Sequence, residues 1–185
     1  SLCALDAGVS RDTSMGFSTL DGIPMATRCG ALDAGVVLYL VEQQGLRIKD
    51  VEKMLYEKSG LLGVSGISAD SRELLASDRP EAREALALFA FRIAGETARL
   101  ATSLGGLDSL VFTAGIGEHQ PETRRAVCER LAWLGVELDP QANNGNARLI
   151  SSARSRVAVL VLPTDEEQII ANEAISVLHQ EEAKT

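Results

Sequence analysis

The residues best suited to chemistry in this sequence are two glycines, Gly115 and Gly117, which directly follow a short apolar run. That run, Leu110–Phe112, is partly β-branched and predicts a strand covered on both faces. Glycine at both positions allows positive φ and lets a ligand approach the backbone closely. The pattern therefore predicts a buried strand that ends in a turn able to accommodate a ligand.

A helix is predicted to begin just after this turn. His119 or Gln120 can cap it, and Pro121 suits its first turn. Free amides at a helix start, together with the positive end of the helix dipole, favour phosphate or carboxylate oxygens. The alternative is an ordinary tight β–α turn in which the glycines serve packing alone, since the stretch is neither a P-loop nor a GxGxxG fingerprint. The pattern leaves both interpretations open.

Two further segments place carboxylates at predicted helix starts. The apolar run Val157–Leu162 predicts a second buried strand, after which Thr164 and Glu167 fit a capping box. Asp70 is a plausible N-cap of another helix. In both places, stabilisation of a helix start accounts for the carboxylates without any ligand.

One arginine, Arg28, lies in a loop over residues 21–35 that is rich in Gly and Pro and otherwise poor in charge. Its guanidinium has few local carboxylates with which to pair. From the loop alone, a surface arginine is the default interpretation.

Composition excludes several classes of partner. The 185 residues carry a formal net charge of −8 at pH 7, so no basic stripe is present to neutralise nucleic-acid phosphates. The three cysteines form no CxxC pair, which indicates reduced thiols in a cytoplasmic protein. The apolar runs are strand-sized, far short of the roughly 20 residues that a membrane span needs. We expect a cytoplasmic protein that binds neither nucleic acid nor membrane.

The rest of the chain predicts the elements that must position these residues. Three short strands, Ser1–Asp6, Gly8–Thr13 and Met15–Leu20, are expected to form an antiparallel meander. Helices are expected over residues 36–44, 48–58 and 79–104, from residue 121 to Gly135, and after residue 167. Phe89, Phe91 and Leu100 are expected in the core, and Ile169, Ile170, Ala174 and Val177 on the inner face of the last helix. This pattern predicts an α/β fold, a mixed sheet flanked by helices.

Four blocks, in the same order, resemble the acetate kinase family. Phe112–His119 resembles the family block FTAGIGEN. The loop over residues 21–35 resembles MGTRCG(D/S)(I/L)DP, residues 67–73 resemble GxSxDxR(D/E), and residues 163–167 resemble PT(N/D)EE. The likeness extends from Ser1, which matches the final serine of a HLGNGAS motif, to about Ala174.

The resemblance implies an actin-like ATPase (ribonuclease H-like) domain of the acetate and sugar kinase superfamily. It also implies reversible transfer of the ATP γ-phosphoryl group to acetate, giving acetyl phosphate and ADP. A carboxylate is already nucleophilic at pH 7, so no general base is needed. Catalysis then depends on positioning and on charge neutralisation by Mg²⁺ and arginine.

The same resemblance assigns roles to individual residues. Arg28 becomes the catalytic arginine that stabilises the phosphoryl group in transfer, a role suited to its planar fork of donors. Asp70 and Arg72 hold the nucleoside, with Ser71 between them where the family often has Phe or Met. Glu166 is associated with Mg²⁺, usually through water. Backbone groups of a fourth segment line the nucleotide: Gly115, Ile116, Gly117, Glu118 and His119, the last at the family's usual Asn position.

The chain starts with Ser1 inside a predicted strand, so we expect residues 1–185 to form the carboxy-terminal nucleotide-binding domain without its first strand and the amino-terminal domain. Such a piece is expected to show nucleotide affinity at best and negligible turnover. A propionate or butyrate kinase of the same family is an alternative. Another is a non-catalytic dimerisation module, because the helix carrying Val36–Val41 is apolar nearly all round and must be buried or form an interface, here a homodimer contact.

Overall fold

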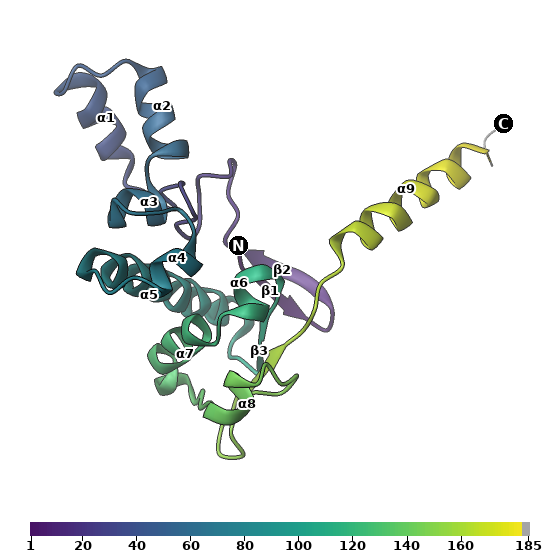
Figure 1. Ribbon diagram of the computed structural model, residues 1–185. Coiled ribbons are helices and arrows are strands. Elements are labelled where there is room, and N and C mark those ends of the chain that lie inside the picture. The colour runs from purple at the N-terminus through teal and green to yellow at the C-terminus, as the bar shows by residue number, and fades with distance from the viewer. Residues whose placement is uncertain (183–185) are drawn as a thin grey trace.

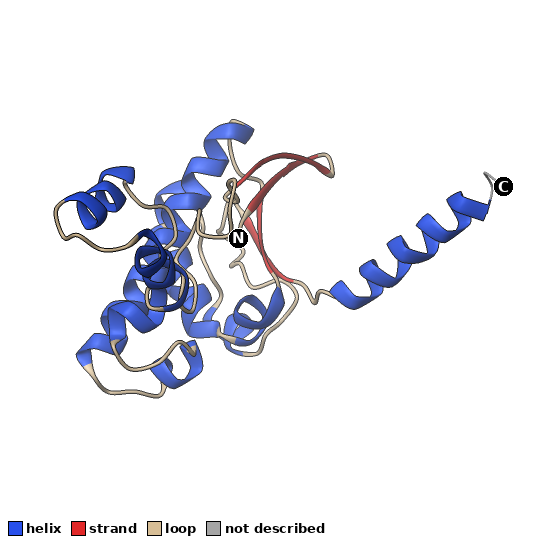
Figure 2. Ribbon diagram, turned by 90° about the horizontal axis from the view of Figure 1, so that it is seen from above, coloured by secondary structure: helices blue, strands red, loops and turns tan. Residues whose placement is uncertain are grey.

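The computed structural model describes residues 1–182 of the chain, and the side chains of residue 166 and of residues 178–182 lie outside that description. Helices α5 and α7 pack beside the strands, while α1 and α2 stand away from the body and α9 projects from it (Figures 1 and 2). The elements are β1 (Cys3–Asp6), β2 (Val9–Thr13), α1 (Ala34–Glu42), α2 (Ile48–Glu57), α3 (Gly60–Ser65), α4 (Ser71–Leu75), α5 (Pro80–Leu104), β3 (Ser109–Phe112), α6 (Ala114–His119), α7 (Pro121–Arg130), the 3₁₀ helix η1 (Ala132–Leu134), α8 (Pro140–Asn144), β4 (Ala158–Val161) and α9 (Glu166–Glu182).

The amino-terminal strands form a hairpin and not the predicted meander. β1 and β2 pair antiparallel, with an irregularity between Ala4 and Leu5. The third strand predicted at Met15–Leu20 is wrong, because local turns take its backbone groups: the Leu20 amide donates to Ser18 Oγ and the Asp21 amide to the Ser18 carbonyl. Once those groups are used within the segment, they are not available to extend a sheet.

The two later strands pair parallel, in a register that sets Leu110 beside Val159 and Phe112 beside Val161. The other edge of β4 is bonded antiparallel to residues 148–150, through the Ile150 amide to Val159 and the Val161 amide to Arg148. The expectation that β3 is covered on both faces is wrong, because Val111 is exposed. Within the described residues, β3 and β4 form a sheet separate from the hairpin.

Helix α5 is the longest element and contributes to both hydrophobic cores. It begins at Pro80 with Arg79 in the N-cap position, so Asp78 is not the cap that its type suggests, and it ends at Gly105 in the left-handed conformation. Phe89 and Leu100 are buried as predicted, but Phe91 is exposed, since it lies on the outer face of the helix. The first core packs α5 against α7, β3 and β4: Ala90, Ala94, Val127, Cys128, Leu131, Val136, Ile150, Val157, Val159 and Val161.

A second core joins the long loop after β2 to helices α3, α4 and α5. Its buried members are Ile23, Leu61, Leu74, Ala82, Ala85 and Phe89. Ile116 of α6 packs against this cluster from the other side. Segments separated by many residues in the sequence, α4 and α6, are thereby held next to each other.

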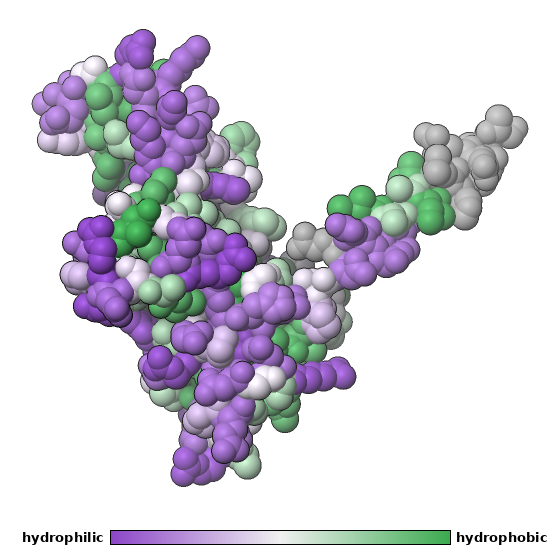
Figure 3. Space-filling model, in the orientation of Figure 1, coloured by the Kyte–Doolittle hydropathy of each residue, from purple (hydrophilic) through white to green (hydrophobic). Residues whose placement is uncertain are grey.

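Two helices carry apolar side chains that no described residue covers. Val36, Leu38 and Tyr39 of α1 are exposed, as are Ile169 and Ile170 of α9, and Figure 3 shows hydrophobic surface along both helices. The predicted inner face of α9 is therefore wrong for this structure, because the helix projects from the body without packing on it (Figure 1). No helix within the described residues is both long and apolar enough to cross a membrane.

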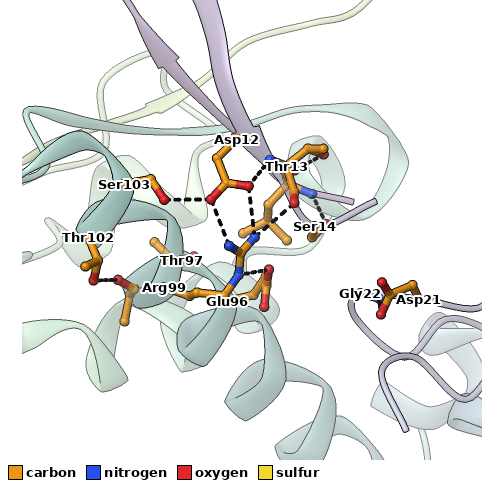
Figure 4. A network of polar contacts seen from close by, with 12 residues as sticks. Asp12, Thr13, Ser14, Asp21, Gly22, Glu96, Thr97, Arg99, Thr102 and Ser103 are labelled. Atoms are coloured by element: carbon orange, nitrogen blue, oxygen red, sulfur yellow. Dashed lines mark hydrogen bonds and ion pairs between the residues drawn. The ribbon is translucent and has the colours of Figure 1, made fainter. Parts of the chain in front are cut away.

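A polar network fixes β2 to α5 (Figure 4). Asp12 accepts hydrogen bonds from Ser103 Oγ at 2.6 Å and from Arg99 Nη1 at 2.8 Å, and Arg99 also donates to Glu96 at 2.6 Å. The Ser103 hydroxyl, followed by the Arg99 guanidinium, lowers the pKa of Asp12 to about 2. An ionised carboxylate is thus one of the groups that link the hairpin to α5.

Acid should weaken this link. The folded-state pKa of Asp12, about 2, lies below its ordinary value of 3.8, so its stabilisation is complete above about pH 4 and is lost as the pH falls through 2. We expect Asp12→Asn to lower the free energy of unfolding at pH 7, and the gap from wild type to shrink between pH 4 and pH 2. Urea titrations across this range measure the difference in the free energy of unfolding between wild type and Asp12→Asn. In a Ser103→Ala background, the effect of Asp12→Asn at pH 7 should be smaller. A gap independent of pH would contradict the assignment.

Candidate functional site

A pocket of about 670 Å³ lies between the start of α4 and helix α6. Its volume falls within the roughly 300–1,000 Å³ of typical small-molecule sites. The lining residues are Ala69, Asp70, Ser71, Arg72, Gly115, Ile116, His119 and Gln120. Six of these were predicted site residues, and they come from two segments that the second core brings together.

On the α4 side, Asp70 caps the helix and pairs with Arg72. Its Oδ1 accepts from the Arg72 amide at 2.8 Å, and Arg72 Nη2 donates to Oδ2 at 2.6 Å. The Arg72 side-chain hydrogen bond, and then the backbone bond, lower the pKa of Asp70 to about 2. The N-cap interpretation is therefore confirmed, and the pair presents an ionised carboxylate and an exposed guanidinium at the pocket. A contact of this pair with a nucleoside stays a prediction.

A buried bridge joins the two sides of the pocket. Gln120 Nε2 donates to Ser71 Oγ at 2.7 Å, and Gln120 Oε1 accepts from Thr123 Oγ1 at 3.0 Å. Ser71, Gln120 and Thr123 are all buried. Because each of these polar atoms has a partner, the bridge fixes the start of α4 against the α6–α7 junction without leaving an unsatisfied group.

The glycine stretch is a short helix, α6, and not an open turn. The positive φ falls on Ala114, at 58°, whereas the prediction placed it on Gly115 and Gly117. Gly117 is required for packing, since a Cβ there would lie 3.1 Å from the Phe112 carbonyl carbon. Gly115 borders open space at the pocket. The chain therefore passes from β3 into α6 through one residue with positive φ, Ala114, and the glycines belong to α6.

The far end of α6 is held by Arg124 of α7, whose side chain is fully buried. Arg124 Nη1 donates to the carbonyls of Gly117 at 2.8 Å and Glu118 at 3.0 Å. Its Nε and Nη2 donate to Asn143 Oδ1 and the Asn143 carbonyl, and Nη2 also donates to Asn146 Oδ1 at 2.6 Å. One guanidinium thus connects α6, α7 and α8 directly below the pocket.

Comparison with known proteins decides the family to which this chain belongs. A model of the Acetokinase family matches residues 1–172. The chain belongs to the acetokinase family.

Relatives and solved structures agree with this assignment. The acetate kinase of Rhodopseudomonas palustris strain TIE-1 is 56% identical over 173 residues, covering 92% of this chain and 44% of the relative. That of Methylocella silvestris is 50% identical over 180 residues, 97% of this chain and 45% of the relative. The crystal structure of Porphyromonas gingivalis acetate kinase matches with a TM-score of 0.87 and 37% identity, covering 95% of this chain and 46% of that one.

A propionate kinase from Francisella tularensis matches equally well, with a TM-score of 0.87 and 37% identity over 92% of this chain and 45% of that one. The predicted α/β, actin-like ATPase fold is confirmed by these structures. The chain spans less than half the length of the curated relatives it matches.

In this acetokinase chain, the predicted catalytic Arg28 does not line the pocket. Its Nη1 donates to the Thr19 carbonyl at 3.3 Å, and within the described part of the chain it forms no ion pair. This agrees with the expectation that its guanidinium has few local carboxylates with which to pair. The structure does not bring Arg28 together with the residues of α4 and α6, so its role in phosphoryl transfer stays a prediction.

The predicted metal residue of the acetokinase, Glu166, has its side chain outside the described residues. The segment before it approaches α6: Glu118 Oε1 accepts from the Thr164 amide at 3.2 Å and from Thr164 Oγ1 at 3.3 Å. The capping box expected of Thr164 and Glu167 is wrong, because Thr164 bonds to Glu118 and Asp165 accepts from the Gln168 amide instead. Glu118 therefore faces the β4–α9 segment and not the pocket.

The described part of the chain contains two cysteines whose thiol pKa is raised, and it contains no preformed metal cluster. Burial raises the pKa of Cys128 to about 12, and burial also raises the pKa of Cys29. No group of three or more His, Cys, Asp or Glu side chains among the described residues could hold a metal ion.

Sequence reasoning missed two residues on which the acetokinase pocket depends, Gln120 and Arg124. Gln120 was considered only as a helix cap. Arg124 had a signal: it lies three and seven residues before Val127 and Leu131, which were expected to point inward. A charged residue at such a spacing occupies the buried face, where it must find several hydrogen-bond partners.

Proposed function

We propose that this chain is the carboxy-terminal, nucleotide-binding domain of an acetate kinase, which transfers the γ-phosphoryl group of ATP reversibly to acetate. The observation that carries the proposal is the pocket in which Asp70–Arg72 meet Gly115, Ile116 and His119. These are the segments that resemble the nucleotide-contacting blocks of the family. The acetate kinases among the relatives support the same reaction, and we place the protein in the cytoplasm.

In this proposal the chain binds and orients the nucleotide and neutralises charge. Asp70 and Arg72 hold the nucleoside at the α4 side, and backbone groups of α6 line the phosphates. Arg28 stabilises the phosphoryl group in transfer with its planar donors. Because an acetate carboxylate is nucleophilic at pH 7, no side chain has to remove a proton.

The residues around the start of α9 suit Mg²⁺, which would neutralise charge on the phosphate oxygens when bound. The segment offers oxygen donors only, on Thr164, Asp165 and Glu166, and magnesium prefers a few such ligands together with water. Glu118 anchors this segment at Thr164 beside α6. We assign Glu166 to the metal on this basis and on the family resemblance.

Two alternatives have an observation of their own. The likeness to the Francisella propionate kinase makes propionate a candidate acceptor, with butyrate next in the series, and turnover with each carboxylate decides among them. The exposed Val36, Leu38 and Tyr39 on α1 favour a homodimer contact, with or without catalysis. Gel filtration together with ATP titration separates these: a dimer that does not bind ATP favours the non-catalytic module.

The pocket assignment is tested by filling the pocket. A Cβ at Gly115 meets no heavy atom within 4 Å, so Gly115→Leu should fold normally and place its side chain in the pocket. We expect its Kd for MgATP, measured by calorimetric titration of the chain, to rise at least about tenfold. Thermal unfolding should show a midpoint no lower than that of the wild type.

A matched control exists on α5. Gly95 is also a helical glycine with no heavy atom within 4 Å of its Cβ position, and it lies outside the pocket. Gly95→Leu should therefore bind MgATP like the wild type. The proposal fails if the wild-type chain binds no MgATP, and the pocket assignment fails if Gly115→Leu binds as tightly as Gly95→Leu.

A further inference from the structure

Arg124 is the charged side chain that this structure buries most completely, with no exposed surface. It forms no ion pair within the described part of the chain, and burial lowers its pKa. A buried cation without a carboxylate is unfavourable unless all of its donors are satisfied. Here they are satisfied by five hydrogen bonds to carbonyl and amide oxygens on α6, on α8 and on Asn146 just after α8.

Helix α6 needs such a partner because it is only six residues long. The carbonyls of its last turn have no hydrogen-bond donor inside the helix. The Gln120 amide donates to the Ile116 carbonyl, and Arg124 donates to the next two, those of Gly117 and Glu118. The orientation of α6 therefore depends on this guanidinium at its carboxy-terminal end and on the packing of Ile116 within the helix.

We propose that Arg124 is a positioning residue for the nucleotide pocket. By holding the last turn of α6, it keeps Gly115, Ile116 and His119 at the pocket lining. Arg124 does not itself line the pocket, so it acts through α6. The proposal rests on the proposed function, since it is there that the pocket is assigned to a nucleotide.

A purely structural role would link α7 to α8 through Asn143 and Asn146, with the α6 contacts incidental. The two roles predict different effects of substitutions on the stability of α6. Arg124→Lys keeps the charge but has one nitrogen and no fork, so it cannot reach α6 and α8 together. Asn146→Gly removes only the acceptor just after α8 and leaves the α6 and Asn143 acceptors in place, and glycine keeps the positive φ of 51° at this position. Val127→Ala opens a cavity one turn along α7 and lowers stability without touching α6.

The test measures amide hydrogen exchange of residues 114–120 and the Kd for MgATP in the full chain carrying each variant. We expect Arg124→Lys to speed exchange of α6 selectively and to raise the Kd roughly tenfold. Asn146→Gly and Val127→Ala should speed exchange only in proportion to their loss of global stability, with the Kd unchanged.

The outcomes separate the two proposals. The positioning role is overturned if amide exchange of α6 rises no more in Arg124→Lys than in Val127→Ala. It is also overturned if α6 exchanges faster in Arg124→Lys but the Kd for MgATP does not change. A wild-type chain that fails to bind MgATP overturns both the proposed function and the nucleotide part of this role. Selective loosening of α6 would then still show that Arg124 fixes the helix.

Discussion

On the proposed function, Arg28→Lys is expected to lower the kcat for acetyl phosphate formation about 10³-fold, by analogy with arginines that stabilise phosphoryl transfer. Lysine keeps the positive charge but lacks the planar fork that contacts more than one equatorial oxygen. Because this interaction forms in the transition state, KM for MgATP should change far less than kcat. A coupled assay of acetyl phosphate formation measures both constants.

Arg92 provides a matched control. Like Arg28, it donates one 3.3 Å hydrogen bond to a carbonyl of the long loop, in its case that of Ala31. Arg92→Lys should leave kcat within about twofold of the wild type. If Arg28→Lys behaves in the same way, then Arg28 is a surface residue and the resemblance of its loop to the family block carries no catalytic role.

Gly60→Ala is expected to destabilise the protein by about 4 kcal/mol or more, among the largest effects of a single substitution. Gly60 has φ +60°, and an added Cβ would lie 2.1 Å from the Met25 carbonyl oxygen and 2.8 Å from that of Arg28. Backbone atoms cannot move away as a flexible side chain can. The loop that carries Arg28 must shift, or α3 must separate from it.

Gly66 separates this clash from backbone strain. It also has φ +60°, but no heavy atom lies within 4 Å of its Cβ position. Gly66→Ala should therefore cost only the strain of alanine in the left-handed region, roughly 1–2 kcal/mol. Chemical denaturation of both variants measures the difference. Equal losses would show that the loop and α3 are not in the close contact described here.

Local patterns were sufficient for several elements. Helix α5 between Pro80 and Gly105, the Asp70 N-cap and the strands at Leu110–Phe112 and Val157–Leu162 were predicted close to their observed bounds. Each depends on interactions within a few residues along the chain, such as helical periodicity, a cap or a glycine stop. The sequence resolves such features because they need no distant partner.

Predictions failed where the partner of a residue is set by tertiary packing and not by its neighbours in the sequence. Thr164 has the type of a capping residue, but its hydroxyl bonds to Glu118, 46 residues away. Phe91 has the type of a core residue, but it lies on the face of α5 that no described element covers. The apolar side chains described on α9 meet no other described element, since that helix projects from the body. Residue type indicates what a side chain can do, and the packing decides what it meets.

The sequence by itself determined the family resemblance, the strands that precede the glycine block and the last acidic block, and six of the eight residues that line the pocket. Only the tertiary structure decided which of these residues share a pocket. It joined α4 to α6 through Ser71 and Gln120, left Arg28 outside the pocket lining, and buried Arg124 below it. The physical reason is that a hydrogen bond or a buried charge is fixed by distances between segments, and no spacing along one segment contains those distances.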